Sequence, residues 1–310
     1  VILVGDGGQA PPVGEKSAIP FTKHGRDKYR IGYYELNEIV RQAEGNPLIK
    51  FSTKLRKRIN SPSPILNTDD DTVGDEGVIW IRNTERKRLA LLIRDLFTSD
   101  NFLRDADYAK VICWRRKYVA TFNDLVRRFV FKDKGELPKV LAGDKMIASN
   151  VVINTVTEDI VMANSTEFEV NAVDKVVVDW EGYSFEAYNC KITTIETYPK
   201  KLVIQIIHER SEAKYKKLLK DIADEANNAE KWDKMRIWAK FWKLKNLFAS
   251  VNYNYAITIH RAQGSTYKYA LLIVEDVFSH TRNPYERNRL IYTACTRPSS
   301  TLYMVGDLEI

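Results

Sequence analysis

At residues 256–267 the sequence reads AITIHRAQGSTY, an apolar segment that runs into a polar turn. The first four residues have the character of a buried β-strand that ends at Ile259. The Gly-Ser-Thr turn that follows exposes backbone N–H and hydroxyl groups, and such a turn can bind an anion. This stretch therefore predicts a strand of a sheet, with a candidate anion site just beyond its end.

Strand-like and helix-like segments alternate on both sides of this stretch. Short apolar runs that we expect to be strands lie at residues 78–81, 109–113, 270–274 and 302–305. Segments with helical periodicity lie at residues 86–97, 119–129 and 287–295. Because strands that alternate with helices are typical of parallel sheets, the predicted fold class is α/β with a parallel sheet.

The pattern changes in the middle of the chain. From Asp144 to Ile207 short strand-like runs, among them residues 168–180 and 202–207, are separated by Asn, Gly and Pro turns. This arrangement predicts a small antiparallel barrel. Residues 211–248 are polar and helical. The simplest interpretation is an α/β domain that is interrupted by an inserted barrel and a helical arm.

The helical arm contains three tryptophans, Trp232, Trp238 and Trp242, among ten Lys/Arg and six Asp/Glu. Aromatic rings in a basic helix can stack on nucleic-acid bases. More often such rings pack a helix onto its own domain. The i, i+4 spacing of Trp238 and Trp242 favours packing, but the sequence leaves both interpretations open.

The first 60 residues predict one strand, a loop and an interrupted helix. Residues 1–25 read as a strand, a Gly-rich turn and a Pro-Pro loop. Val1–Val4 reads as a buried strand that starts abruptly, so we expect an N-terminal part to precede it. Tyr34–Asn60 reads as a helix that is interrupted near Gly45-Asn46-Pro47.

Two nucleotide-binding patterns near the N-terminus fail on physical grounds. Gly5, Gly7 and Ala10 have the spacing of a dinucleotide fingerprint, which needs a helix that begins inside it. Pro11-Pro12 removes two N–H donors and disfavours that helix. In residues 14–17, GEKS, the G-K-S of a P-loop is interrupted. A dinucleotide-dependent oxidoreductase is therefore disfavoured.

Composition excludes several classes of protein. The formal net charge of +7 and the pI near 9.1 point weakly to a polyanionic partner. Cys113, Cys190 and Cys295 are far apart and form no C-x-x-C motif, which argues against a disulfide framework or a zinc site. No apolar run approaches the ~18 residues that a membrane span needs, so we expect no membrane partner.

Four segments together resemble motifs of superfamily 1 DNA helicases of the RecD/Dda type. Residues 4–13, VGDGGQAPPV, resemble motif III, G-D-x-x-Q-L-P-P-V, with Ala10 in place of leucine. Residues 258–266, TIHRAQGST, resemble motif V, T-x-H-K-x-Q-G-S-T. Residues 292–297, YTACTR, resemble motif VI, Y-V-A-x-T-R, and residues 36–42, LNEIVRQ, resemble motif IV. The resemblance extends over essentially the whole chain.

The resemblance implies roles for the matched residues. Arg297 is expected to be an arginine finger, and Arg41 and Gln9 are expected to face the nucleotide phosphates with it. The residues expected to contact the nucleotide are Gly5, Asp6, Gln9, Gly264, Ser265 and Arg297. Those expected to contact nucleic acid are Thr258, His260, Arg261, Asn123 and Arg116, the last at a position where the family often has asparagine. No residue of this chain is expected to ligate a metal ion.

The resemblance also implies a domain organisation. Residues 1–33 would be a remnant of a first RecA-like motor domain, and residues 34–137 with 252–310 would form a second. Residues 138–251 would form an inserted SH3-like barrel with a helical arm.

The function implied is that of the C-terminal part of an ATP-dependent DNA helicase. Such a protein would move 5′-to-3′ along single-stranded DNA as a monomer, in the cytoplasm of a bacterium or a phage-infected host. Its cofactors ATP and Mg²⁺ would need a P-loop and acidic ligands that this sequence lacks, so we expect the chain alone to hydrolyse no ATP. The main alternative is a non-catalytic nucleic-acid-binding module derived from a helicase.

Overall fold

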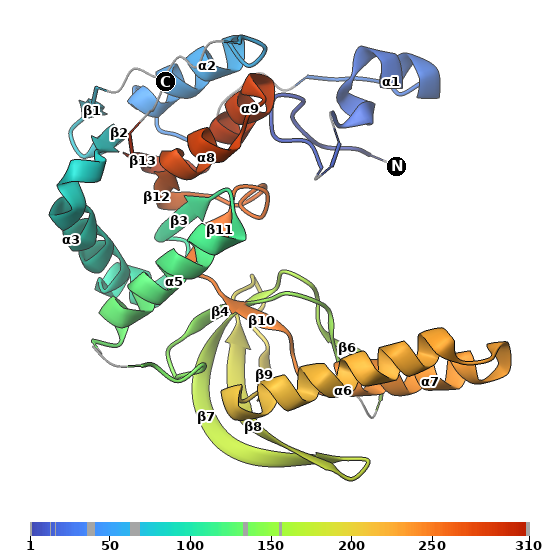
Figure 1. Ribbon diagram of the computed structural model, residues 1–310. Helices are drawn as coiled ribbons and strands as arrows, with labels where there is room; N and C mark the ends of the chain where they lie inside the picture. Colours follow the sequence, from blue (N-terminus) through green and yellow to red (C-terminus); the bar gives the residue numbers. More distant parts are fainter. Residues whose placement is uncertain are drawn as a thin grey trace. The chain divides into compact units, whose positions relative to one another are not determined.

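The computed structural model describes residues 2–12, 14–15, 17–35, 41–62, 69–132, 136–154 and 157–307. The chain divides into two compact units (Figure 1). Unit 1 consists of Val1–Lys132 and Tyr255–Ile310, and unit 2 consists of Asp133–Asn254. No helix among the described residues is long and apolar enough to cross a membrane.

Unit 1 is built around a six-stranded sheet in the order β1-β2-β13-β12-β3-β11. The strands are β1 (Asp71–Val73), β2 (Glu76–Ile81), β3 (Ala109–Cys113), β11 (Ala256–Thr258), β12 (Tyr267–Ile273) and β13 (Pro298–Val305). All neighbours are parallel except β1, which pairs antiparallel with β2 at the edge. Every residue of β3 is buried, as expected for a parallel strand that helices cover on both faces. The predicted α/β class is confirmed.

The helices of unit 1 lie before its first strand and between its later strands in the chain (Figure 1). They are η1 (Ile19–Phe21), α1 (Lys23–Tyr29), α2 (Pro47–Lys57), η2 (Asn83–Glu85), α3 (Arg86–Phe97), α4 (Asp100–Arg104), α5 (Arg116–Val130), α8 (Val274–His280) and α9 (Pro284–Cys295). Helix α2 packs against α9, and α3 packs against α5. Apolar side chains of α2, α8 and α9 meet those of the sheet in one core, which includes Leu48, Val277 and Ile291.

The helix expected over Tyr34–Asn60 is only partly confirmed. Residues 36–40 lie outside the described residues, and α2 begins at Pro47. The Asn46 side chain caps the helix by accepting a hydrogen bond from Leu48 N at 2.9 Å. Proline is favoured at the first helical position because its missing N–H would have no partner there. Gly45, with φ of +86°, lets the backbone turn just before the cap.

The strand expected at Val1–Val4 is wrong for residues 2–4, and Val1 lies outside the described residues. Ile2 and Val4 are exposed, and neither belongs to a strand. Apolar composition favours a strand only when a neighbouring strand completes its backbone hydrogen bonds. Within the described part of the chain, no strand of the six-stranded sheet pairs with these residues.

Unit 2 contains a five-stranded antiparallel sheet in the order β10-β4-β7-β8-β9, and a small hairpin of two further strands. The strands are β4 (Lys145–Ala148), β5 (Val152–Ile153), β6 (Ile160–Met162), β7 (Glu167–Trp180), β8 (Tyr183–Thr194), β9 (Lys201–Ile207) and β10 (Val251–Tyr253). Ala249 N, just before the edge strand β10, donates to Gln205 O in the other edge strand at 2.7 Å. The sheet therefore curls until its two edges approach each other.

Strands β7 and β8 form a long hairpin that runs to the Trp180–Tyr183 pair. Its two turn residues, Glu181 and Gly182, have φ of +45° and +82°. Positive φ at both positions is the geometry of a type I′ turn, whose twist matches that of the paired strands. This local geometry explains why the two strands stay paired up to the tip of the hairpin.

Two long helices, α6 (Glu209–Asn228) and α7 (Lys231–Lys245), lie side by side and pack on the outer half of this hairpin (Figure 1). Their shared core includes Phe185 and Ala187 of β8 with Ile222, Ile237 and Leu244 of the helices. Farther along β8, Tyr188, Cys190 and Ile192 belong to the core of the curled sheet. A single strand thus contributes side chains to both cores of unit 2.

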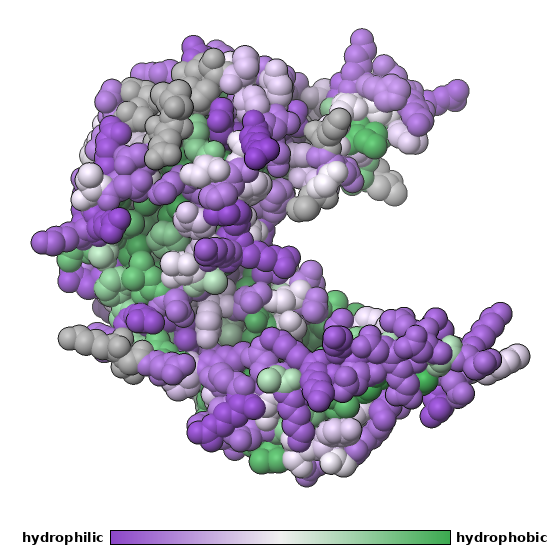
Figure 2. Space-filling view, in the orientation of Figure 1, coloured by the Kyte–Doolittle hydropathy of each residue, from purple (hydrophilic) through white to green (hydrophobic). Residues whose placement is uncertain are grey.

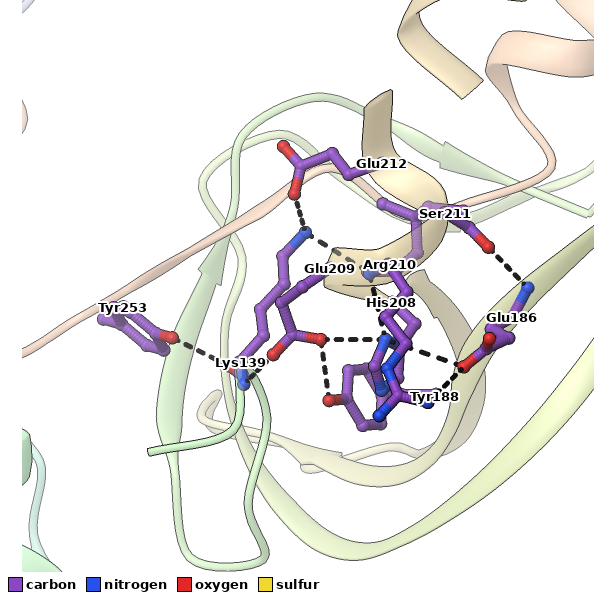
Figure 3. A network of polar contacts seen from close by, with 10 residues as sticks. Lys139, Glu186, Tyr188, His208, Glu209, Arg210, Ser211, Glu212 and Tyr253 are labelled. Carbon is purple, nitrogen blue, oxygen red and sulfur yellow. Dashed lines mark hydrogen bonds and ion pairs between the residues drawn. The ribbon is translucent and has the colours of Figure 1, made fainter. Parts of the chain in front are cut away.

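A polar network fixes the start of α6 to the sheet (Figure 3). His208 caps α6, because its Nδ1 accepts a hydrogen bond from Arg210 N at 3.2 Å, and its ring stacks on Tyr188 with 4.7 Å between ring centroids. The Tyr188 hydroxyl donates to Glu209 at 2.8 Å, and the Lys139 ammonium donates to Glu212 at 3.0 Å. The arm is therefore anchored at its root by both stacking and charge.

Candidate functional site

The structure brings together three of the segments that the sequence singled out. Ala10 N donates to Thr293 Oγ1 at 2.8 Å, which joins the first segment to α9. Gln263 Nε2 donates to Ala10 O at 2.8 Å, which joins the same residue to the turn after β11. Ala10 itself is buried in the core of unit 1. Residues that lie more than 250 positions apart in the sequence thus form one contiguous cluster.

Asp6 lies at the edge of this cluster, with its carboxylate held from three sides. It pairs with the Arg56 guanidinium, accepts from the Tyr292 hydroxyl at 3.0 Å, and accepts from Gly8 N at 2.9 Å. Burial opposes ionisation of this carboxyl, but the hydrogen bonds from Arg56 and Gly8 outweigh it and keep the pKa below 3.8. The contact between Arg56 and Asp6 was not predicted from the sequence, because nothing local links the two residues.

Gly5 and Gln9 flank Asp6 in the same segment. A Cβ atom at Gly5 would lie 2.5 Å from the Phe21 ring, so the close approach requires glycine. Gln9 N donates to Asp6 O at 3.0 Å and closes the turn. The segment is therefore a compact turn that rests on α9 and is not the start of a helix. Val13, at the end of the matched motif, lies outside the described residues.

The turn after β11 uses its own backbone N–H groups. Ala262 N donates to Thr258 O at 3.0 Å, and Ser265 N donates to Ala262 O at 3.2 Å. Arg261 N donates to Thr258 Oγ1 at 3.3 Å, and Gly264 has φ of +89°. In the Gly264-Ser265-Thr266 turn, the N–H of Ser265 is thus bonded to a neighbouring carbonyl. The anion site expected at this turn stays a prediction.

His260 lies in this turn and faces the first segment. Burial lowers its pKa below 6.5, although Glu286 and a hydrogen bond to the Pro11 carbonyl act in the opposite direction. The imidazole is therefore mainly neutral at pH 7. In this form it serves as a hydrogen-bond donor between two segments rather than as a charged contact.

Arg297 is almost fully buried, with 2% of its surface exposed. Its Nε donates to Thr293 O at 3.0 Å, and its Nη1 donates to the carbonyls of Ala262 at 3.4 Å and Ser265 at 3.2 Å. Its Nη2 donates to Thr296 Oγ1 at 2.7 Å. Burial lowers its pKa to about 10, so the group is still charged at pH 7, and each of these partners is neutral.

Arg41 brings a second guanidinium to the same place. Its Nε donates to Thr266 Oγ1 at 2.8 Å and its Nη1 to Thr296 O at 2.5 Å. Burial lowers its pKa, and its charge also disfavours protonation of Arg297. Two cations that repel each other at one turn would both be stabilised by an anion placed between them. Residues 36–40 of the same matched motif lie outside the described residues.

Asn123 and Arg116 both belong to α5, but Asn123 is buried and Arg116 is exposed. Asn123 is buried, and its amide oxygen accepts from Tyr255 N at 3.1 Å and Ala256 N at 2.8 Å, while its Nδ2 donates to Ala256 O at 3.2 Å. This position argues against the predicted nucleic-acid contact, because the amide ties α5 to β11 in the interior. Arg116 is exposed at the first residue of α5.

The turn between β3 and α5 is held by a residue that sequence reasoning missed. Asp276 of α8 is fully buried, and its Oδ2 accepts from Trp114 N and Arg115 N, each at 2.8 Å. The Arg115 Nε also donates to Asp276 Oδ1 at 2.8 Å. Asp276 follows Arg115 by 161 residues, so no local pattern could reveal this contact.

A basic cavity of about 730 Å³ lies at the carboxyl ends of strands of the six-stranded sheet. Its charged lining residues are Arg82, Arg86, Arg115, Lys117 and Glu275. The excess of positive charge makes this cavity suitable for an anionic ligand. The arginines after β2 were not singled out from the sequence.

Metal ligands of the usual kinds are not clustered in the described part of the chain, where no group of three His, Cys, Asp or Glu could hold a metal ion. The three cysteines are buried free thiols. Burial raises the pKa of Cys190 to about 12, so this thiol is neutral at pH 7.

A known family of domains covers two of these segments, the turn after β11 and the end of α9. Residues 253–305 match the UvrD-like helicase C-terminal domain. This match contains both the turn after β11 and Arg297, so this part of the chain is similar to the C-terminal domain of such helicases. The chain is also 23% identical, over 354 residues, to "Uncharacterized protein R530" of Acanthamoeba polyphaga mimivirus. That alignment covers 97% of this chain and 68% of the viral protein.

Solved helicase structures resemble the chain more distantly. The Pif1 helicase from Candida albicans is 13% identical with a TM-score of 0.49, over 97% of this chain and 62% of that protein. The Pif1 helicase from Bacteroides in complex with ADP-AlF3 and ssDNA is 16% identical with a TM-score of 0.40, over 99% and 61%. The chain therefore spans about three fifths of the length of these helicases.

Proposed function

We propose that this chain is the C-terminal motor part of an ATP-dependent DNA helicase of superfamily 1, of the RecD/Dda type. The observation that carries the proposal is the cluster in which Ala10 is bonded to Thr293 and Gln263. The match of residues 253–305 to a UvrD-like helicase domain supports the helicase part of this proposal. The proposal extends to 5′-to-3′ movement along single-stranded DNA as a monomer, and to an SH3-like character of the curled sheet in unit 2.

The nucleotide phosphates would be held by the two guanidiniums of the cluster. Arg41 is the less buried of the two and is the better placed to meet a phosphate from solvent. Arg297, bonded to neutral groups, would supply uncompensated charge to a transferring phosphoryl group as an arginine finger. The other residues proposed for the nucleotide side are Gly5, Asp6, Gln9, Gly264 and Ser265.

Mg²⁺ and the P-loop belong to the chemistry that ATP hydrolysis requires. The side chains of the cluster fit the phosphates of ATP, since the cluster contains two guanidiniums. They do not fit the metal, since Asp6, the carboxylate described there, is already bonded to Arg56, Tyr292 and Gly8.

Single-stranded DNA would lie along basic groups of unit 1, of which Arg116 is exposed and Arg261 is half-buried. We propose Arg116 and Arg261 for phosphate contacts, Thr258 and His260 for neutral contacts, and the basic cavity near Arg82 as part of the same surface. A non-catalytic nucleic-acid-binding module is the second candidate. It is favoured by the buried Arg297 guanidinium, whose bonds to backbone carbonyls are those of a structural residue.

Salt-dependent DNA binding tests the proposal. We expect a fluorescent single-stranded oligonucleotide to bind the 310-residue chain with an affinity that falls steeply with salt, by ~0.7 log unit per log unit of salt for each phosphate neutralised. Arg116→Ala combined with Arg261→Ala should reduce that slope, because each substitution removes one phosphate contact. The matched control is Arg104→Ala, which removes an exposed arginine from α4. A flat salt titration of the unsubstituted chain would contradict the proposal.

A further inference from the structure

Helix α7 carries apolar side chains on two opposite faces. On the inner face, Ile237 and Leu244 are buried and Phe241 packs against the same core. On the opposite face, Trp232, Met235, Ala239 and Trp242 follow one another at i, i+3, i+7 and i+10, which aligns them along one side of the helix. We call these four residues the outer stripe.

The outer stripe is open to solvent. Trp232 is 91% exposed, Met235 is 81% exposed and Trp242 is 50% exposed. The inner face already attaches α7 to the hairpin and α6, so the packing of unit 2 does not require Trp232 or Met235. The Trp242 ring also contacts the Phe241 ring edge-to-face, with 5.3 Å between ring centroids. Figure 2 shows that hydrophilic side chains cover most of the visible face of the two helices, with a few apolar ones between them. An aligned set of exposed large apolar side chains marks an interaction surface.

The charge around the outer stripe indicates what this surface binds. Residues Lys231–Lys245 contain six Lys/Arg and one Asp. By helical spacing, Arg236 and Lys243 follow one side of the stripe, and the Lys245 ammonium lies 4.6 Å from the centre of the Trp242 ring. Arg236 pairs with Asp233 at 3.1 Å, and Lys240 pairs with Glu181 at 2.7 Å. Even so, cations outnumber carboxylates along α7, which favours a polyanionic partner.

We propose that the outer stripe of α7 binds single-stranded nucleic acid, with bases stacked on Trp232 and Trp242 and phosphates on the flanking cations. Exposed rings bordered by cations are the two elements that sequence-independent single-strand binding combines. The two rings are ten residues apart, or about 15 Å along the helix, which equals the length of about four stacked nucleotides. This site belongs to unit 2 and shares no residue with the DNA contacts proposed in unit 1. Binding at this site requires no ATP hydrolysis.

The first test locates the contact directly. An oligothymidylate that carries 5-iodouracil is irradiated with the full chain, and the crosslinked residues are identified by mass spectrometry. Crosslinks are expected at Trp232 or Trp242, since this reaction favours aromatic rings stacked on the base. Absence of any crosslink on α7, when crosslinks form in unit 1, overturns the inference and leaves the proposed function intact.

The second test separates stacking from charge. It measures the binding of an oligothymidylate and of an abasic strand of the same length. The protein is the full chain with Arg116→Ala and Arg261→Ala, which remove the phosphate contacts proposed in unit 1. Trp232→Ala with Trp242→Ala should weaken oligothymidylate binding by about ten-fold for each stacked base lost. Abasic-strand binding should not change, and Trp232→Phe with Trp242→Phe should preserve the affinity. Tyr198→Ala, which removes an exposed ring from the β8–β9 turn, is the matched control.

Two outcomes of this second test overturn the inference. An equal loss for both strands would show that the rings do not stack on bases. A change from dimer to monomer on sedimentation of the Trp232→Ala, Trp242→Ala variant would show that a second copy of the chain covers the stripe.

Discussion

At the scale of single residues, the side chains with the strongest matches to helicase motifs are also bonded within the protein. Arg297 donates to three backbone carbonyls, and Asp6 accepts from three donors. Each therefore contributes to stability as well as to any catalytic role. This double role makes simple loss of activity a poor test, because a variant that unfolds is also inactive.

Arg297→Ala should lower the free energy of unfolding of unit 1 by about 1–3 kcal/mol, because the carbonyls of Ala262 and Ser265 would lose their donor in the interior. Arg297→Lys should recover little of this loss, since an ammonium cannot reproduce the planar fork of donors. Chemical denaturation measures both variants, with Arg282→Ala, an exposed arginine, as the control. Unchanged stability of the alanine variant would mean that the guanidinium is not held as described and is available to a phosphate.

Asp6 makes the free energy of unfolding of unit 1 depend on pH. Its pKa in the folded protein lies below 3.8, so its contribution to stability is complete at neutral pH and is lost as the pH falls through the folded pKa. Asp6→Asn should therefore cost about 1 kcal/mol at pH 7, a modest value because Arg56 is partly exposed. The difference between the variant and the unsubstituted protein should shrink as the pH is lowered toward 3. A difference that stays constant from pH 7 to pH 3, measured by urea denaturation, would contradict the assignment.

At the scale of helices and strands, most of unit 1 could be predicted from the sequence. The runs at residues 109–113 and 86–97 coincide with β3 and α3, because their apolar residues follow the period of each structure. The strand at Val1–Val4 failed because strand formation needs a partner that local composition cannot supply. The interruption expected near Gly45-Asn46-Pro47 is where α2 begins, because Asn46 and Pro47 form its cap.

The candidate site was only partly predictable for a related reason. The matched segments indicated which residues belong together, but not which of them would be buried. Asn123 has the character of an exposed polar residue in the sequence, yet it is required inside to satisfy the backbone of Tyr255 and Ala256. The role of Asp276 could not be predicted from the sequence. Its carboxylate accepts hydrogen bonds from Trp114 N and Arg115 N, which lie far away in the sequence. Contacts of this length depend on topology, which local patterns do not encode.

At the scale of the whole molecule, the two units have separate cores and should unfold separately. Asn123→Ala should lower the stability of unit 1 by about 1–3 kcal/mol, because two buried N–H groups would lose their acceptor. His208→Ala should lower that of unit 2 by about 1 kcal/mol through loss of the α6 cap. Differential scanning calorimetry should show two transitions, each shifted by one variant by about 2–4 °C per kcal/mol. A single transition that both variants shift equally would contradict independent units.

The hairpin that contributes to both cores of unit 2 has a mechanical consequence. Strands β7 and β8 are paired from Phe168–Thr194 to Trp180–Tyr183. Helices α6 and α7 pack only on the half of this hairpin that is nearer its turn. Because both strands contribute side chains to the core under the helices, a pull on the helices along the strand direction loads the β4–β7 and β8–β9 ladders in shear, so that many hydrogen bonds must break together. A pull across the strands would instead open these ladders one rung at a time. The two helices should therefore resist displacement along the strands strongly and displacement across the strands weakly. Bending is expected at the His208–Tyr188 stack, where α6 begins.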